Sequence, residues 1–186
     1  MCMSISAIVC VDKNWGIGYQ GNLLAKIPED MMFFKTMTEG RTVVMGKTTY
    51  DSLPVKPLKN RNNIVITYHP ATHISEESTT LTFLDMNQIK KLLTGPKSEM
   101  ETLHEIYIAG GQQIYNALLP YCQRAYVTKI LNAYPAADVY FPNIDEQPEW
   151  NLSSTSDIKE YDGVLYQFCI YDRVDKEEVA NEKNIV

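Results

Sequence analysis

Cysteine and histidine are scarce in this sequence, and their spacing matches no common metal site. The four cysteines are scattered without a CxxC pair, which is typical of reduced thiols in a cytosolic protein. His69, His73 and His104 could be considered as metal ligands, since the first two are four residues apart, but Pro70 disfavours a regular helix between them, and no cysteine or acidic cluster accompanies them. We therefore predict that the protein binds no metal.

Positive charge and long hydrophobic runs are also lacking. The net charge is −6, which argues against a general nucleic-acid binder, because such proteins present a basic surface. The first residues, MCMSISAIVCV, contain neither a basic segment nor an apolar run long enough for a signal peptide or a membrane span. We expect a cytoplasmic monomer that binds a small molecule and neither nucleic acid nor membrane.

Apolar strand-like segments alternate with helical patterns along the chain. The expected strands are 4–11, 42–45, 64–67, 79–84, 105–109, 124–131, 151–159 and 164–173, and the last two are joined by a turn at 161–163. The expected helices are 28–38, a short one after Thr48, 86–93 and 112–119. This order predicts one α/β domain over residues 1–174, with a mostly parallel sheet of about eight strands, an antiparallel C-terminal hairpin and about four flanking helices. Residues 175–186 are expected to form a charged, solvated tail.

The segment Leu23–Thr38, LLAKIPEDMMFFKTMT, combines a helix start with a carboxylate near apolar residues. Pro28 suits the first helical position. Apolar residues then recur at helical spacing: Met31, Phe34 and Met37. Asp30 lies on or beside this face, and a buried carboxylate needs a partner or a function. Alternatively Asp30, like Glu29, complements the helix dipole in water.

Two strand-to-helix turns combine glycine with small polar residues. They are Met45-Gly46-Lys47-Thr48-Thr49 and Ala109-Gly110-Gly111-Gln112-Gln113. In a parallel sheet both turns open at the carboxyl edge, where glycine lets backbone approach a phosphate and helix N–H groups attract anions. Neither turn is a GxGxxG motif or a P-loop, and glycine also makes ordinary tight connections. Together with Lys47 they suggest a ligand with a pyrophosphate, such as a dinucleotide. Thr48 is expected to cap the short helix, with Asp51 completing a capping box.

Three single residues allow both a functional and a structural interpretation. Arg61, in a proline-rich basic loop, could bind a carboxylate in bidentate fashion or could be an ordinary surface arginine. Trp15, in the glycine-rich loop 12–22, could cover a ligand or anchor the loop in the core. Thr128 could hydrogen-bond a buried carboxylate, although threonine is also a normal strand residue.

Taken together, these segments resemble the dihydrofolate reductase family. The family's elements arrive in order from about residue 4 to residue 173: Ile17-Gly18, Ile27-Pro28-Glu29-Asp30 with Phe34-Lys35, Val44-Met45-Gly46-Lys47-Thr48-Thr49, Pro57-Leu58, Arg61-Asn62-Asn63-Ile64, Ile108-Ala109-Gly110-Gly111 with Tyr115, Thr128, and Asp138 through Phe141-Pro142. No single motif is specific, whereas the ordered set is.

The resemblance implies an oxidoreductase of one-carbon metabolism that reduces 7,8-dihydrofolate to tetrahydrofolate by hydride transfer from NADPH. By analogy Asp30 anchors the pterin, with Thr128 bracing it, and promotes protonation of N5 by a proton that arrives through water. Arg61 would hold the glutamate α-carboxylate. The implied substrate-binding residues are Ala7, Asp30, Phe34, Lys56, Leu58, Arg61, Ala109, Tyr115 and Thr128.

The resemblance also implies a cofactor site and a cis peptide bond between Gly110 and Gly111. Residues at the nicotinamide would be Ile8, Ile17 and Gly18, with Tyr115 between nicotinamide and pterin. Residues at the pyrophosphate would be Gly46, Thr48, Thr49, Gly110, Gly111, Gln112, Gln113 and Ile114. Residues around the adenosine 2′-phosphate would be Lys47, Thr67, Tyr68 and His69.

Three departures separate this chain from the family pattern. Leu24-Ala25 stands where most relatives carry Pro-Trp, which alters the expected hydration of Asp30. Gln112-Gln113 replaces the Gly and Arg of many relatives, so that preference for NADPH over NADH rests mainly on Lys47. The acidic tail after Arg173 has no assigned counterpart.

Two rival functions remain open at this point. The pyrimidine reductase of riboflavin synthesis shares the fold and the nicotinamide cofactor, but it has no need for Asp30 paired with Arg61. A non-catalytic nucleotide-binding protein on the same fold requires an empty or blocked pterin pocket.

Overall fold

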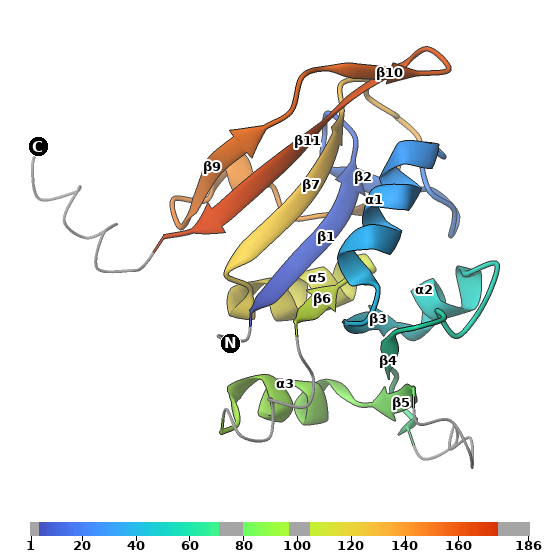
Figure 1. Ribbon diagram of the computed structural model, residues 1–186, viewed down its shortest axis with the longest axis vertical. Helices are drawn as coiled ribbons and strands as arrows, with labels where there is room; N and C mark the ends of the chain where they lie inside the picture. Colours follow the sequence, from blue (N-terminus) through green and yellow to red (C-terminus); the bar gives the residue numbers. More distant parts are fainter. Residues whose placement is uncertain (1–3, 71–79, 97–104, 175–186) are drawn as a thin grey trace, which may run out of the picture.

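A nine-stranded sheet runs through the protein, and its computed structural model describes residues 4–70, 80–96 and 105–174 (Figure 1). The strands are β1 (Ile5–Val11), β3 (Thr42–Gly46), β4 (Asn62–Ile66), β5 (Leu81–Leu84), β6 (Ile106–Ile108), β7 (Arg124–Ile130), β9 (Trp150–Thr155), β10 (Lys159–Tyr161) and β11 (Val164–Arg173). Their order is β10-β11-β7-β1-β6-β3-β4-β5, and β9 also pairs with β11. The pairs that involve β11 are antiparallel and the others are parallel. The predicted α/β class, parallel sheet and antiparallel C-terminal hairpin are confirmed.

Helices cover both faces of this sheet. They are α1 (Pro28–Thr38), α2 (Lys47–Ser52), α3 (Met86–Thr94) and α5 (Gln112–Leu118), with 3-10 turns η3 (Leu119–Tyr121) and η4 (Ile144–Glu146). Figure 1 shows α1 in front of β1 and α5 behind it. Strand alternation explains the separation, because Val9 and Val11 share a cluster with α5 while Cys10 belongs to the cluster beside the start of α1. In the described ranges, no helix has the length and apolar character that a membrane crossing requires.

Helix α1 begins at Pro28, as predicted, but its buried face differs from the expected stripe. Met31 is 51% exposed. Phe34 of that stripe packs on the cluster of β3 and β4 residues, and Phe33 also contacts the sheet, at ring-centroid distances of 4.9 Å to Phe168 and 6.1 Å to Tyr126. Phe33 and Phe34 are about 100° apart on the helix, so α1 faces the sheet with a broader surface than the expected stripe.

The predicted cap of the short helix is wrong. Helix α2 begins at Lys47 directly after Gly46 and has no side-chain cap. Thr48 therefore lies inside the first turn, where it cannot serve as the N-cap. Asp51 forms an ion pair with Lys47 one turn earlier instead of completing a capping box.

The C-terminal region forms three strands where two were predicted. The segment 151–159 divides into β9 and β10, and both pair with β11. The expected turn is confirmed: Asp162 and Gly163 have φ values of 50° and 76°, as a two-residue hairpin turn requires. Two short strands were not predicted, β2 (Gly16–Gly18) and β8 (Val139–Tyr140). Their pairing ties the loop 12–22 to the segment after β7.

Candidate active site

Asp30 lies in the first turn of α1 with its carboxylate directed at the sheet. Its side chain is half-buried and hydrogen-bonds Thr128 of β7, which is 1% exposed. Burial raises the pKa of the Asp30 carboxyl above its usual range, and the hydrogen bond from Thr128 offsets part of that rise. The structure thus brings together the two residues that the sequence suggested as a pair.

The ionisable neighbours of Asp30 are held neutral. Burial, followed by the charge of Asp30, raises the pKa of the Cys10 thiol well above its usual value. The same two causes raise the pKa of Tyr115, whose hydroxyl donates to the Ile8 carbonyl at 2.8 Å. Burial and a hydrogen bond to Glu29 raise the pKa of Tyr166 to about 12. The ionisable groups that Asp30 meets therefore add no charge of their own beside it.

Three predicted substrate-binding residues form one apolar wall beside α1. Phe34, Leu58 and Ala109 all pack against the same small cluster. The core of that cluster is Val43, Met45, Tyr50 and Val65. Ala7 of β1 is fully buried, so it can offer its backbone but little side-chain surface.

Arg61 is buried, with an exposed fraction of 8%, so its interpretation as a surface arginine is wrong. Its Nε donates to Thr38 Oγ1 at 2.8 Å, Nη1 to the Lys59 carbonyl at 3.0 Å and Nη2 to the Lys35 carbonyl at 3.4 Å. These bonds hold the guanidinium against the C-terminal end of α1. Each terminal nitrogen makes one such bond with the described residues, so a second N–H on each can bind a carboxylate.

The two glycine turns meet at one point, as the sequence predicted. The Gly46 N–H donates to the Gly110 carbonyl at 2.7 Å. A Cβ added at Gly46 would lie 3.1 Å from the Ile114 side chain. Gly110 has a φ of +101°, a Cβ there would lie 2.9 Å from the Tyr115 ring, and the Gly110–Gly111 peptide is cis. The positive φ and the close Tyr115 ring require glycine at 110, and a side chain at either glycine would press on residues of α5.

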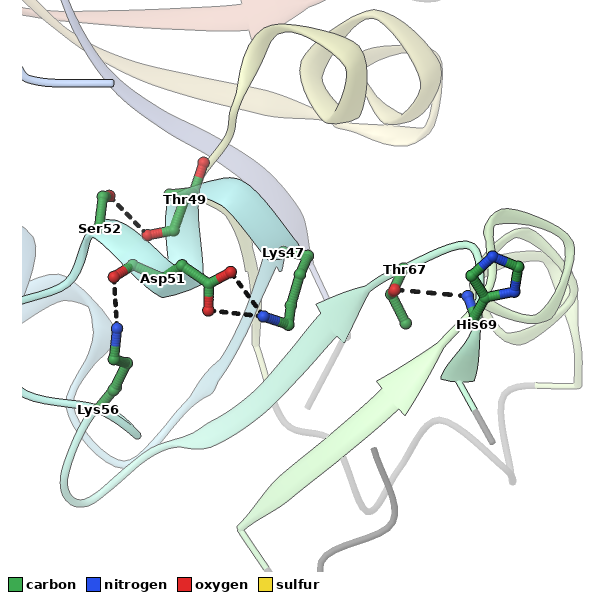
Figure 2. Close-up of polar contacts among 7 residues, drawn as sticks. All are labelled: Lys47, Thr49, Asp51, Ser52, Lys56, Thr67 and His69. Atoms are coloured by element: carbon green, nitrogen blue, oxygen red, sulfur yellow. Dashed lines mark hydrogen bonds and ion pairs between the residues drawn. The ribbon is translucent and has the colours of Figure 1, made fainter. Parts of the chain in front are cut away.

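Lys47 and Thr67 lie side by side because they follow the paired residues Gly46 and Ile66 of β3 and β4. Figure 2 shows the Lys47 ammonium held by both oxygens of Asp51, at 2.7 and 2.6 Å. The backbone N–H of His69 contacts Thr67 Oγ1 at 3.4 Å. The structure therefore gathers the predicted 2′-phosphate residues at one edge, with the lysine already paired.

The remaining predicted cofactor and substrate residues differ in how far they are exposed to solvent. Tyr68 is 85% exposed, and Thr48, His69 and Gln113 are also exposed. Thr49, Gly111 and Ile17 are half-buried, while Gly18 and Ile114 are buried. Lys56 is exposed, donates to the Asp51 carbonyl and lies 5.9 Å from the Tyr50 ring, next to α2.

Trp15 anchors the loop 12–22 in the core. It is 6% exposed and stacks on Phe141 at a ring-centroid distance of 6.0 Å. Lys129 Nζ lies 4.6 Å from the centre of its ring. The interpretation as a ligand cover is therefore wrong for Trp15, since its ring is already covered by protein.

Asp12 is a loop-organising residue that the sequence reasoning missed. Its Oδ1 accepts hydrogen bonds from the N–H groups of Asn14 and Gly16 at 2.8 and 2.7 Å, and its Oδ2 accepts from that of Tyr134 at 2.7 Å. Asp12 is 2% exposed. The local signal was an aspartate two residues before an asparagine in a glycine-rich loop, a common turn pattern.

Cysteines and possible metal ligands are not gathered in the part of the chain described. Cys10, Cys122 and Cys169 are free thiols. Within residues 4–70, 80–96 and 105–174 there is no group of three His, Cys, Asp or Glu side chains that could hold a metal. His73 and His104 lie outside these ranges.

Comparison with known proteins decides the family. The family model described as dihydrofolate reductase matches residues 4–173. The chain belongs to the dihydrofolate reductase family. The dihydrofolate reductase of Bacillus subtilis (strain 168) is 34% identical over 174 residues, which cover 91% of this chain and 94% of that protein. The dihydrofolate reductase of Schistosoma mansoni is 34% identical over 188 residues, with coverage of 91% and 96%.

A solved structure of the family supports the same assignment. The dihydrofolate reductase from Enterococcus faecalis, complexed with NADP(H) and RAB-propyl, has a TM-score of 0.74 and 26% sequence identity to this chain. The similarity covers 92% of this chain and 97% of that one. The resemblance to dihydrofolate reductases read from the ordered motifs is therefore confirmed.

Leu24 and Ala25, which stand where the family usually has Pro-Trp, line a small pocket. The pocket is a small hollow with room for about one water molecule. It is lined by Cys10, Val11, Ile17, Leu23, Leu24, Ala25 and Ile130. Since Cys10 also interacts with Asp30, this pocket reaches the neighbourhood of the carboxylate.

Gln112 differs from the family pattern in its role as well as its identity. Its side-chain Oε1 accepts a hydrogen bond from the backbone N–H of Tyr140 at 2.6 Å. The glutamine thus holds β8 against the start of α5. It contributes no charge for a phosphate.

Proposed function

We propose that this chain catalyses the NADPH-dependent reduction of 7,8-dihydrofolate to 5,6,7,8-tetrahydrofolate. The observation that carries the proposal is the half-buried Asp30 carboxylate, paired with Thr128 and surrounded by neutral groups. Membership of the dihydrofolate reductase family supports it. The NADP(H) bound to the Enterococcus faecalis relative supports NADPH as the reductant.

The two glycine turns suit the cofactor, because backbone without side chains at the carboxyl edge of β3 and β6 can approach a phosphate closely. Gly46, Gly110, Gly111 and Thr49 would hold the pyrophosphate, with Ile8, Ile17, Gly18 and Tyr115 at the nicotinamide. Bound NADPH supplies a hydride. The chain's own contribution is to orient the two ligands and to exclude water between them.

Asp30 acts on the pterin ring. Its carboxylate accepts hydrogen bonds from N3 and the 2-amino group, and its charge stabilises the positive charge that develops when water delivers a proton to N5. Thr128 keeps the carboxylate oriented. Phe34, Leu58 and Ala109 contact the apolar parts of the substrate, and Arg61 binds the α-carboxylate of the glutamate.

The test is NADPH oxidation by the purified chain with dihydrofolate as acceptor. We expect turnover with dihydrofolate and none with the pyrimidine intermediate of riboflavin synthesis. The reverse preference would indicate the riboflavin-pathway reductase. NADPH binding without turnover of either acceptor would indicate a nucleotide-binding protein that has lost the chemistry.

Cofactor preference should respond to Asp51. In the resting protein both Asp51 oxygens occupy the Lys47 ammonium. Asp51→Asn frees Lys47 for the 2′-phosphate, and we expect the dissociation constant for NADPH to fall about twofold while that for NADH is unchanged, since an exposed i,i+4 ion pair is worth only about 0.5 kcal/mol. Fluorescence titration with each cofactor measures both constants.

The matched control is the same change in a chain that lacks the lysine. In Lys47→Ala, the further change Asp51→Asn should leave the ratio of the two constants almost unaltered. An equal gain for NADPH in both backgrounds would mean that Asp51 acts by repelling the phosphate directly and not through Lys47.

Three expectations from the sequence stay predictions: a monomeric state, a cytoplasmic location and no binding of nucleic acid. The net charge of −6 supports the last of them. The charged tail 175–186 lies outside the described residues.

A further inference from the structure

Glu29, the residue before Asp30, joins helix α1 to the C-terminal hairpin. Its Oε1 lies 2.7 Å from Lys159 Nζ of β10, and its Oε2 accepts a hydrogen bond from Tyr166 Oη of β11 at 2.6 Å. The two partners are 130 and 137 positions away in the sequence. Tyr166 is 2% exposed, so one of the partners is a rigid part of the core.

The exposed Glu29 side chain adds to the contacts that hold the start of α1 against the sheet. Its N-cap, Ile27, has no side-chain capping bond, but it is buried and packs with Ile130 and Tyr166, and Asp30 itself hydrogen-bonds Thr128 of β7. Successive residues of a helix point about 100° apart. A Glu29 side chain held at both oxygens therefore restricts the rotation of the first turn and with it the direction of its neighbour Asp30.

The sheet places the partners of the two carboxylates in adjacent rows. Phe168 of β11, Thr128 of β7 and Cys10 of β1 lie side by side, and Tyr166 pairs with Ile130 two residues away. Asp30 meets the first row through Thr128. Glu29 contacts the second row, the paired residues Tyr166 and Ile130, through Tyr166. The first turn of α1 therefore contacts two consecutive rows of paired residues in the sheet.

Charge is balanced in the same arrangement. The groups that face Asp30 from neighbouring elements are Cys10 of β1, Tyr115 of α5, Thr128 of β7 and Tyr166 of β11. The hydrogen bonds from Lys159 and Tyr166 lower the pKa of Glu29. Glu29 is thus charged and paired with Lys159, and the pair adds no net charge beside Asp30.

We propose that Glu29, held by Lys159 and Tyr166, is a positioning residue that sets the direction and the electrostatic surroundings of the Asp30 carboxylate. The proposal rests on the proposed function only in taking Asp30 as the pterin anchor. Lys159 and Tyr166 belong to a hairpin to which the sequence analysis assigned no part in the site.

Two variants that each remove one charge test the proposal, because it predicts that they shift the pKa of Asp30 in opposite directions. Glu29→Gln leaves the Lys159 charge unpaired, which stabilises the Asp30 carboxylate and lowers its pKa. Lys159→Met leaves the Glu29 charge unpaired, which raises the pKa of Asp30. We expect the pKa of Asp30 to shift by about half a pH unit in each direction, because solvent partly screens the charges of Glu29 and Lys159 from Asp30. Carbon-13 NMR titration of the Asp30 carboxyl measures the shift without any turnover, and Asp30→Asn assigns its resonance.

A third variant tests the mechanical part. Tyr166→Phe removes one hydrogen bond and no charge, so we expect the KM for dihydrofolate to rise about fivefold with the KM for NADPH unchanged, as the loss of one charge-assisted bond allows. Two substitutions of Glu29 provide a comparison. Glu29→Gln keeps an oxygen that can accept the hydrogen bond from Tyr166, so it should retain more substrate affinity than Glu29→Ala.

The chain contains a matched control on the other face of the sheet. Tyr171 Oη donates to Asp145 Oδ1 at 2.6 Å, and Asp145 Oδ2 lies 2.6 Å from Lys129 Nζ. Tyr171 packs in the cluster opposite that of Tyr166. Tyr171→Phe should therefore cost stability but leave the Asp30 titration and both KM values unchanged.

The outcomes separate the two proposals. Shifts of the same sign in Glu29→Gln and Lys159→Met, or none in either, would overturn the positioning role. So would an equal effect of Tyr166→Phe and Tyr171→Phe on the KM for dihydrofolate. A wild-type chain without dihydrofolate turnover would overturn the proposed function instead, while the NMR titration would still decide the role of Glu29.

Discussion

Asp30→Asn should lower kcat/KM for dihydrofolate by at least about 10²-fold near neutral pH, with part of the loss recovered at lower pH. Asparagine keeps the size and one hydrogen-bonding oxygen of the side chain but not its charge, so it cannot stabilise positive charge developing at N5. At lower pH the solvent supplies the proton more readily, which replaces part of this contribution. Steady-state rates of NADPH oxidation between pH 5 and about pH 9 measure the effect.

The same variant should be more stable than the wild type at neutral pH. Because burial raises the pKa of Asp30 in the folded state, the folded chain binds this proton more tightly than the unfolded chain. Stability from this group is therefore complete below the usual aspartate pKa and is lost as pH rises through the raised value. Asp30→Asn should raise Tm at pH 7 and leave it nearly unchanged in acid. In the kinetic experiment, equal kcat/KM values for Asp30→Asn and the wild type would show that the Asp30 carboxylate takes no part in the reaction.

Arg61→Ala should raise the KM for dihydrofolate by about 10- to 100-fold and the KM for NADPH by much less. A bidentate, charge-assisted contact with a carboxylate is worth about 1.5–3 kcal/mol, which corresponds to that range. Steady-state kinetics with each substrate varied in turn give both constants. With a dihydropterin that lacks the glutamate, wild type and variant should behave alike.

A control is needed because Arg61 also holds the end of α1 through Thr38 and the Lys35 carbonyl. Thr38→Val removes the acceptor for Arg61 Nε while leaving the guanidinium in place. It should lower Tm as Arg61→Ala does, with only a small change in the KM for dihydrofolate. A larger rise in the KM for NADPH than for dihydrofolate in Arg61→Ala would assign the basic loop to the cofactor.

Features that depend on neighbouring residues were predictable from the sequence. Pro28 starts α1 because its ring suits the first helical position, and Asp162-Gly163 turns the hairpin because both residues tolerate positive φ. The buried strands follow from their apolar runs, and their alternation with helices implies a parallel sheet. The ordered motifs were sufficient for the family.

Features that depend on distant residues were not predictable. The pairing of β2 with β8 joins segments of three and two residues, which are too short to carry a pattern of their own. The burial of Arg61 follows from the position of the C-terminal end of α1, and the burial of Trp15 from Phe141. The ion pair of Lys47 with Asp51 is local by contrast, because the two residues are four positions apart on α2.

Asp30 shows which properties of a site residue follow from the local sequence and which depend on the tertiary structure. Residue type and helical spacing suffice to place a carboxylate beside an apolar face, since both are properties of one short segment. Its raised pKa, its bond to Thr128 and its seating through Glu29 on Tyr166 come from β7 and β11, roughly a hundred residues or more away. Solvent exposure and electrostatic partners arise from such long-range packing, so only the tertiary structure decides whether this acid is a solvated helix residue or the centre of a site.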